Sequence, residues 1–440
     1  MPDKPLIYRD FNIELTDLQD NGTFKVRVIG QTPGGEMRAN ELEIPEYRPE
    51  EFSSLLTKLE KRKGLSKDVL FELGEKLSNL LLPGRVRTLY QQSLQKLRKD
   101  EGLRLRLRIE PLQLGALPWE YTYLQGTSGE KVPSDFLAWQ RRVSIVRYET
   151  IGEPLKPLEE KEKIHIAIVL ATPTDQPDLD VEPDKKAIAA AIGAVNSEVQ
   201  VFESAFVEAA TRDQLLESIK GADIFHFSGH GVFEGTELTP EGKVLKRGKI
   251  ILENTDHQSD PYDSQLLANN LGNAGVRLVI LGACNSAARD EGGAWTGVAP
   301  SLVRENIPAV LAMQYKVRDQ NAARFMALFY ARILGGYSID EAVFEGRQAI
   351  LSNSGVEDRD WGVPVLYLRA EDGVIFPVPK EDETEKQRKS PVVNLQQRIR
   401  IVSGENIGAK IGTMTSGEFK ITQIFDTLSG RNVGIEIDNA

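Results

Sequence analysis

The sequence predicts an α/β protein built on a mostly parallel β-sheet flanked by helices. From residue 164 onward, strand-like and helical segments alternate, which is typical of βαβ units. The strand-like segments are near-continuous apolar runs, as in residues 164–170, and such runs are expected of strands buried on both faces. Before residue 100 the order differs, because short alternating strands come first and helices follow.

Residues 1–100 are expected to form an N-terminal strand-and-helix extension. Asp20, Asn21 and Gly22 predict a turn between the first two strands, and Pro83 and Gly84 separate the last two helices. Strands are predicted from alternating apolar residues, and helices from apolar residues spaced three and four apart. The predicted strands are residues 6–15, 24–29 and 37–44, and the predicted helices are residues 50–61, 68–82 and 87–99.

Residues 103–109 are predicted to be a strand in which leucine alternates with Arg104, Arg106 and Arg108. Alternation with period two places the arginines on one face, and we expect that face to be solvated. Residues 141–147 predict a further strand. The proline-rich, charged residues 154–163 predict an exposed connection.

The main domain is expected to span residues 101–378, with its α/β core at residues 160–378. Between residues 232 and 254 the alternation lapses, and glycines beside an apolar run predict a hairpin or a flap. Strands are predicted at residues 164–170, 199–206, 222–227, 276–281, 309–313 and 363–368. Helices are predicted at residues 184–195, 211–220, 264–271, 295–305, 319–334 and 338–352.

A charged linker is predicted at residues 379–391, followed by a small β module at residues 392–440. The apolar runs of this module are short and are divided by glycine. Two or three Ile-Gly steps occur there, which we take as too few to indicate a solenoid repeat.

Composition argues against several classes of protein. The 440 residues include 54 Lys and Arg against 65 Asp and Glu, a net charge of −11, so no nucleic-acid binding is expected. No apolar run reaches the ~20 residues needed to cross a bilayer, so no membrane insertion is expected. The N-terminus lacks a basic-then-apolar signal pattern, and a single cysteine excludes an internal disulfide framework. Together these observations predict a cytoplasmic protein.

Two segments that carry reactive types of side chain each follow a strand-like run. Residues 222–227 lead into a loop that carries His230, and residues 276–281 lead to Cys284. If the two strands are neighbours in a parallel sheet, their carboxyl ends meet at one edge and bring these side chains together. An imidazole beside a thiol lowers the thiol pKa and can later protonate a leaving amine. Taken alone, however, a lone cysteine after a strand is more often a buried, inert residue.

The two segments resemble the CHAT family of caspase-like cysteine peptidases, within the caspase–separase clan. In that clan a strand and His-Gly precede a second strand and its cysteine by about fifty residues, and here Cys284 follows His230 by 54 positions. Flanking segments agree in the same order, and the resemblance covers about residues 100–370, implying a caspase-like core. These segments are residues 104–120, 307–314, 323–342 and 361–364.

The resemblance implies that Cys284 is the nucleophile and that His230 is the general base and acid. The backbone N–H groups of Gly231 and Cys284 would then form the oxyanion hole, and no metal or other cofactor is expected. Residues 282–286 depart from the animal-caspase signature Gln-Ala-Cys-Arg-Gly, so a preference for aspartate does not carry over.

Some relatives prefer a basic residue before the scissile bond. Carboxylates on loops near the strand ends would suit such a residue, and three are predicted there: Asp175, Asp290 and Glu291. Surface loops commonly carry carboxylates, so the same three residues would also be expected on a surface that binds no substrate.

Other residues are expected to be structural. His226 lies inside a strand run and is interpreted as a satisfied core histidine that supports the His230 segment, whereas His165 and His257 show no partner pattern. Four scattered histidines and one cysteine argue against a structural zinc site. No Gly-x-x-x-x-Gly-Lys-Ser/Thr loop is present, so nucleotide hydrolysis has no support.

The leading hypothesis is a cytosolic, prokaryotic-type cysteine endopeptidase that cleaves a protein substrate through an acyl-enzyme. Relatives in defence and programmed-death systems imply latency until a sensor or regulatory protein activates the enzyme. The alternative is a non-enzymatic scaffold with a CHAT fold. A third hypothesis is self-cleavage in the linker, which contains Lys386, Arg388 and Lys389.

Overall fold

In the computed structural model the chain divides into two compact units, residues 1–378 and residues 379–440. The described residues of the first unit are 5–38, 40–126, 129–148, 155, 157–195, 201–238, 244–282 and 293–377. In the second unit they are the strands at residues 393–399, 410–411, 419–425 and 436–437. The domain boundaries near residues 100 and 391 stay predictions.

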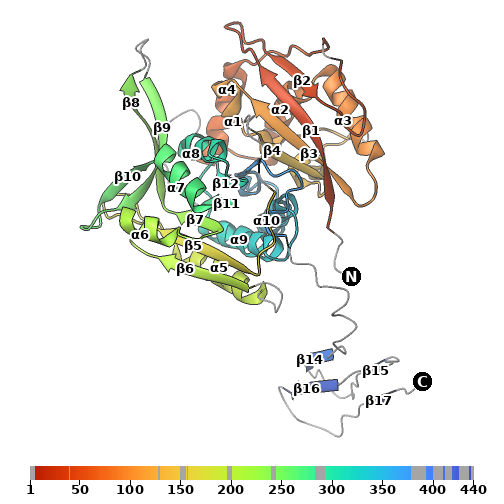
Figure 1. Cartoon of the computed structure of the whole chain (residues 1–440). Coiled ribbons are helices and arrows are strands. Elements are labelled where there is room, and N and C mark those ends of the chain that lie inside the picture. Colours follow the sequence, from red (N-terminus) through yellow and green to blue (C-terminus); the bar gives the residue numbers. More distant parts are fainter. Residues whose placement is uncertain are drawn as a thin grey trace. The chain divides into compact units, whose positions relative to one another are not determined.

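One ten-stranded sheet organises the first unit (Figure 1). Its strands are β1 Ile7–Thr16, β2 Lys25–Ile29, β3 Glu101–Ile109, β4 Val143–Arg147, β5 Lys163–Leu170, β6 Val201–Val207, β7 Ile224–Ser228, β11 Leu278–Leu281, β12 Ala309–Met313 and β13 Pro364–Leu368. They lie in the order β2-β1-β3-β4-β13-β12-β11-β7-β5-β6. Pairing is antiparallel at β1–β2 and β12–β13 and parallel elsewhere in this sheet, which confirms the predicted fold class.

Helices cover both faces of this sheet, and two apolar cores result. Along β5, Ile166 and Ile168 belong to the core that includes residues of α5, α9 and α10, whereas Ala167 and Val169 belong to the core that includes residues of α6, α7 and α8. This two-sided burial explains the continuous apolar runs. The helices are α1 Pro49–Lys61, α2 Lys67–Leu81, α3 Gly84–Lys96, α4 Leu112–Gly115, α5 Glu182–Val195, α6 Arg212–Ser218, α7 Ser264–Ala274, α8 Gly293–Arg304, α9 Asp319–Ile333 and α10 Ile339–Ser354. Among the described residues, no helix combines the length and apolar character needed to cross a membrane.

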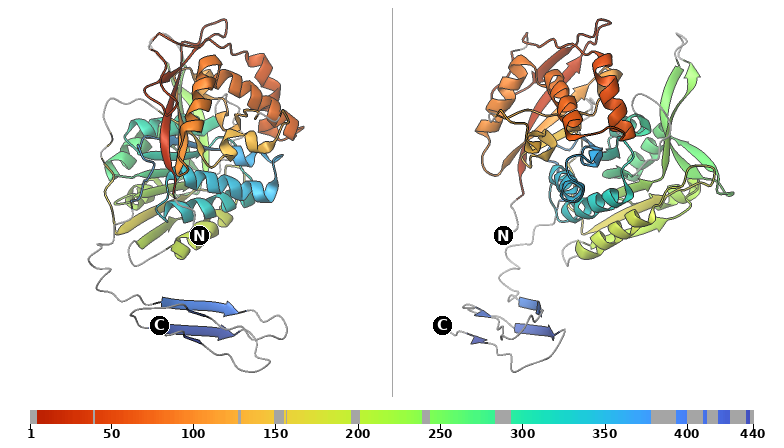
Figure 2. Two further views of the ribbon diagram at one scale, coloured as in Figure 1. Left: turned by 90° about the vertical axis from the view of Figure 1, so that its right-hand side faces the viewer. Right: turned by 180° about the vertical axis from the view of Figure 1, so that it is seen from behind.

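A second, smaller sheet stands beside the strand ends of the first unit. It is antiparallel, in the order β10-β9-β8, and consists of β8 His230–Leu238, β9 Val244–Glu253 and β10 Ser259–Asp263. Figure 2 shows these strands in green, projecting away from the larger sheet. Of the hairpin or flap predicted between residues 232 and 254, the hairpin is confirmed, since β8 and β9 form it from His230 to Glu253.

The N-terminal strands belong to the main sheet, because β1 pairs in parallel with β3 along its whole length. The strand predicted at residues 37–44 is wrong. In the described part of this segment one isolated bridge joins Glu43 to Val26 of β2, and a second bridge, Thr23–Glu46, lies just beyond it. The nearby Pro45 has no N–H to donate and cannot extend a ladder.

The prediction of a solvated basic face on β3 is also wrong. This strand lies between β1 and β4, and Arg104 is fully buried there. Its guanidinium binds both carboxylate oxygens of Asp340 on α10, at 2.9 and 2.6 Å, and contacts Asp10 on β1 at 3.2 Å. Arg106 binds the other oxygen of Asp10 at 2.7 Å. Alternation identified the face correctly, but it carries no information about distant carboxylates that cover that face.

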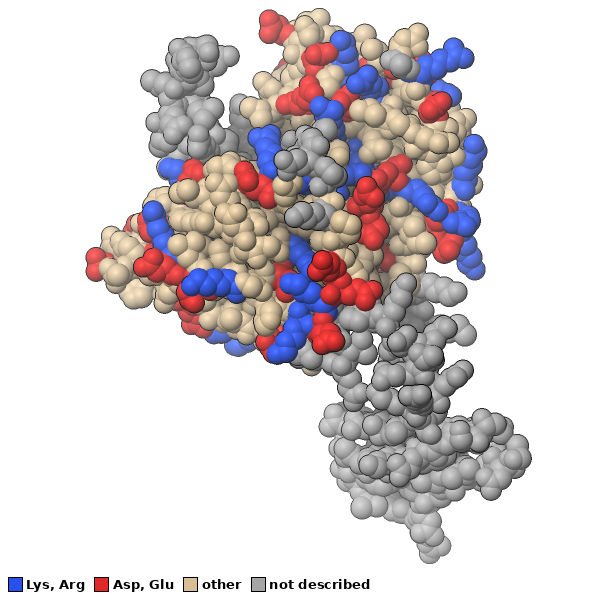
Figure 3. All heavy atoms as spheres, viewed as in Figure 1, with Lys and Arg blue, Asp and Glu red and all other residues tan. Residues whose placement is uncertain are grey.

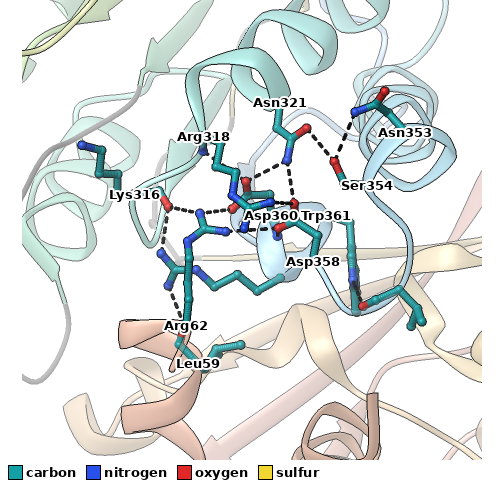
Figure 4. A network of polar contacts seen from close by, with 12 residues as sticks. Leu59, Arg62, Lys316, Arg318, Asn321, Asn353, Ser354, Asp358, Asp360 and Trp361 are labelled. Atoms are coloured by element: carbon teal, nitrogen blue, oxygen red, sulfur yellow. Dashed lines mark hydrogen bonds and ion pairs between the residues drawn. The ribbon is translucent and has the colours of Figure 1, made fainter. Parts of the chain in front are cut away.

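A polar network joins the end of α1 to the turn before β13 (Figure 4). Arg62 follows α1 and donates to Asp358 and Asp360, at 3.2 and 2.5 Å. Asn321 on α9 donates to the same two carboxylates, at 3.0 and 2.9 Å, and Arg318 donates to Asp358 at 2.8 Å. The N-terminal helices are thus tied to the main sheet by ionic contacts as well as by apolar packing.

Charges of both signs are interspersed over the face of the first unit in Figure 3. Ion pairs at the surface of this unit include Lys163 with Glu203 at 2.7 Å and Arg212 with Asp260 at 2.5 Å. On this face, therefore, the described residues form no large area of a single sign.

The Arg104 ion pair gives a prediction for stability. Arg104→Met should lower the free energy of unfolding by about 3–5 kcal/mol, because it leaves the buried Asp340 carboxylate without its charged partner. The matched control on the same strand is Arg108→Met, since Arg108 is 37% exposed and its partner Glu14 keeps Arg27. That control should change stability by less than about 1 kcal/mol. Equal urea-denaturation midpoints for the two variants would contradict the assignment.

Candidate active site

The carboxyl ends of β7 and β11 are level with each other. The two strands are parallel neighbours, and their register places Leu281, the last residue of β11, beside Phe227. The next residue, Gly282, donates its N–H to the Phe227 carbonyl at 2.6 Å. The condition set by the sequence argument, that the two strands are parallel neighbours, is therefore met. On the other side of β7, Leu170 of β5 pairs with Ser228, so three strands end at this edge.

His230 follows β7 almost at once and is 3% exposed. The sequence placed it in a loop, but it is the first residue of β8 and lies in register with Ile251 of β9. Gly229 explains the short connection, because a Cβ there would lie 2.5 Å from the Phe227 ring and 2.9 Å from the Ala171 carbonyl. A residue without a side chain lets the chain turn directly from one sheet into the other.

The exit of β11 is equally tight. A Cβ on Gly282 would lie 2.7 Å from the Ser228 hydroxyl oxygen and 2.9 Å from the Phe227 carbonyl, so only glycine fits without displacement. The structure thus places a residue two positions before His230 against a residue two positions before Cys284. Residues 283–292 lie outside the described residues, and Cys284, Asp290 and Glu291 are among them. Their roles stay predictions.

His226 is fully buried beneath this edge. Its Nδ1 lies 3.0 Å from the Tyr330 hydroxyl of α9, and its Nε2 lies 3.3 Å from the Ser228 hydroxyl. Burial lowers the pKa of His226 to about 3, so the ring is neutral at physiological pH. It is a satisfied core histidine, as the sequence predicted. Through Ser228 it also supports Gly282, because both side chains border the space beside that glycine.

Asp175 lies on the loop after β5, where it accepts hydrogen bonds from the backbone and hydroxyl of Ser259, at 2.9 and 2.7 Å. These bonds lower the Asp175 pKa. A second link joins the same loop to the β9–β10 turn, because the buried Glu253 accepts from the Thr172 N–H and pairs with His257, both at 2.8 Å. The structure shows Asp175 as a brace between loop and hairpin, and its place in a substrate pocket stays a prediction.

Sequence reasoning missed Tyr330 and Glu253. Tyr330 lies 104 positions from His226 and has no local motif that would connect the two residues. Glu253 is the last residue of β9, and no local pattern connects it with the loop after β5 that it contacts. In both cases the missing information was which helix or loop covers the strand ends. Gly231 lies in register with Ile250 in the hairpin, and its oxyanion role also stays a prediction.

Comparison with known proteins gives one family match. The sequence profile of the CHAT domain matches residues 73–391. This agrees with the resemblance seen in the His230 and Cys284 segments and their flanks. No curated protein matches the chain.

Solved structures also match this chain, at low sequence identity. The Saccharomyces cerevisiae separase–securin complex matches at 11% identity with a TM-score of 0.43, and the match covers 81% of this chain. It covers 30% of the separase chain, so this protein corresponds to less than a third of that length. The Arg-specific cysteine proteinase gingipain R matches at 11% identity and a TM-score of 0.41, covering 69% of this chain and 70% of that one.

The buried His226 gives a prediction for pH dependence. Its folded pKa of about 3 lies below the unfolded value, so acidification protonates the unfolded chain first and destabilises the fold. Each pH unit below about 6.5 should remove about 1.4 kcal/mol of stability, until pH approaches the folded pKa. Urea denaturation of wild type and His226→Gln at pH 7, 6 and 5 tests this. The variant should lose less stability between pH 7 and 5, and parallel losses in both proteins would contradict the assignment.

Proposed function

Because the chain belongs to the CHAT-domain family, we propose that it is a caspase-like cysteine endopeptidase with Cys284 as nucleophile and His230 as general base and acid. The observation that carries the proposal is the shared edge of β7 and β11. Gly282 lies against Ser228 there, and the chain leaves this contact toward His230 on one side and toward Cys284 on the other. A thiol–imidazole pair requires its two side chains to lie close together, and strands that end at one edge support such a pairing.

In the proposed reaction, His230 takes the proton of the Cys284 thiol, and the thiolate attacks the carbonyl carbon of a peptide bond. The C–N bond then breaks, and the imidazolium returns its proton to the leaving amine. A water molecule, deprotonated by the same imidazole, cleaves the thioester and releases the acid product and the free thiol. The N–H groups of Gly231 and Cys284 are proposed to stabilise the oxyanion of both tetrahedral intermediates.

The buried groups around His230 favour this role. His226 cannot replace His230 as the base, because its two ring nitrogens lie at hydrogen-bond distance from Tyr330 and Ser228 and its pKa is about 3. His257 is held by Glu253. His165 lies on β5 with its Nδ1 3.4 Å from Glu203, a residue of the edge strand β6. Among the four histidines, His230 is therefore the base that we propose.

We also propose that the enzyme is latent in the cytosol until a sensor or regulatory protein engages it, in a prokaryotic defence or cell-death pathway. An unrestrained endopeptidase would cleave the proteins of its own compartment. The membership in the CHAT family supports this context by analogy alone.

Catalysis by the dyad is tested by substitution. Cys284→Ala and His230→Ala should each lower peptide cleavage about a thousandfold or more, since the nucleophile and its base act as a unit. Ser286→Ala is the matched control from the same segment and should keep near-wild-type activity. The readout is cleavage of a fluorogenic peptide library by the protein with a candidate activator. Cleavage at the wild-type rate by Cys284→Ala would show that the mechanism is wrong.

The specificity proposal has its own test. A pocket with Asp175, Asp290 and Glu291 should favour Arg or Lys before the scissile bond, through charge-assisted hydrogen bonds. Matched substrates that differ only by Arg or Asp at this position should differ at least tenfold in kcat/KM. A faster rate with Asp would contradict the carboxylate pocket without affecting the dyad.

A further inference from the structure

The strands of the second unit pair with a constant offset. β14 Val393–Ile399 is parallel to β16 Phe419–Phe425, with Val393 opposite Phe419. β15 Lys410–Ile411 is parallel to β17 Glu436–Ile437, with Lys410 opposite Glu436. In both pairs each residue lies beside the one 26 positions later (393 with 419, 410 with 436). Figure 2 shows β14 and β16 as two arrows that run in the same direction, one above the other.

The same offset relates two copies of one sequence. When residues 393–414 are aligned with residues 419–440, six positions are identical. They are Gln397 and Gln423, Ser403 and Ser429, Gly404 and Gly430, Asn406 and Asn432, Gly408 and Gly434, and Ile411 and Ile437. The Ile-Gly steps alone were too few to indicate a solenoid repeat, and the repeat found at this offset is a longer unit. Single Ile-Gly steps were too short a unit to reveal a period of 26 residues, which the strand register makes visible.

The charges of the two copies are complementary. Three aligned positions are charged in both copies, and at each of them the signs are opposite: Arg400 and Asp426, Glu405 and Arg431, Lys410 and Glu436. Parallel pairing of two identical segments would set like charges side by side, which destabilises a sheet. Pairing of the first copy with the second avoids this, as at the described pair of Lys410 and Glu436.

We propose that the second unit is an assembly surface that binds a second copy of this chain, head to tail. β16 and β17 of one molecule pair with β14 and β15 of the next, in the register that joins these strands within one chain. Among the described strands, β14 and β16 pair only with each other, so each presents its other edge to a further strand. Pairing of like repeats would set equal charges together at three positions, which favours the head-to-tail order.

Head-to-tail pairing leaves a free first repeat at one end and a free second repeat at the other, so the assembly is open-ended. Each added molecule brings a first unit with it and raises the local concentration of these units. The assembly does not rest on the proposed peptidase activity.

Cross-linking of the full chain tests the register. The background is Cys284→Ala, which removes the one native cysteine. One preparation adds Gln397→Cys and another adds Gln423→Cys. Residues level with each other in neighbouring strands lie about 5 Å apart, which suits a disulfide. This mixture should form interchain disulfides at least fivefold faster than a control mixture of Gln397→Cys with Thr422→Cys. Residue 422 lies one position before residue 423, so its side chain is on the opposite face of the strand.

Two outcomes would overturn the proposal. Equal cross-linking in the test and control mixtures would exclude the register. Efficient cross-linking of Gln423→Cys with itself would indicate a two-fold symmetric pairing instead. Light scattering supplies the second measurement, because the average mass should exceed twice 48.9 kDa and rise with concentration. A constant monomer mass would show that the strand edges do not bind a second copy of the chain.

Charge reversal provides a matched variant and its rescue. Lys410→Glu places like charges at the 410–436 pair, within one chain and between copies, and should raise the concentration needed for assembly several-fold. Lys410→Glu combined with Glu436→Lys restores opposite signs and should restore assembly. A double variant that assembles no better than the single one would contradict the role of charge alternation.

Discussion

The parallel register between β7 and β11 is the constraint on which the candidate active site depends. It sets Phe227 beside Leu281, so both strands end at the same level and Gly282 bonds to the Phe227 carbonyl. A slip of one residue would turn every side chain of β11 to the opposite face, and the two apolar cores would both be disrupted. The same packing that stabilises the sheet therefore fixes where the chain departs toward His230 and toward Cys284.

Sequence patterns predicted the strands of the core well, because strands buried on both faces have a simple signature. Four such apolar runs form β5, β7, β11 and β12, and none of these strands lies at an edge of the sheet. The arginines of β3 show where this approach fails. Their alternation looks like a solvated face, but Asp10 and Asp340 neutralise Arg104, and Asp10 also binds Arg106. Asp340 lies 236 positions away from Arg104. Such compensation is a property of the folded chain and has no local signal.

The candidate site, too, could be predicted from the sequence only in part. The family resemblance and the strand-end rule indicated His230, and the structure places it at the predicted edge, in a hairpin strand instead of a loop. The support beneath that edge could not be read from the sequence, since Tyr330 reaches His226 from α9. The C-terminal repeat was missed for a different reason. Its copies share six of 22 aligned residues, and the parallel register of the strands identifies the offset at which to compare them.

The central claim is that His230 lies beside Cys284 and activates its thiol. The chain has one cysteine, so the rate at which iodoacetamide modifies the native protein reports on Cys284 alone. If His230 activates the thiol, a plot of this rate against pH will rise well below pH 8.5, the ordinary thiol pKa, and His230→Ala will move the rise to about 8.5. A rise near pH 8.5 in both proteins would contradict the account.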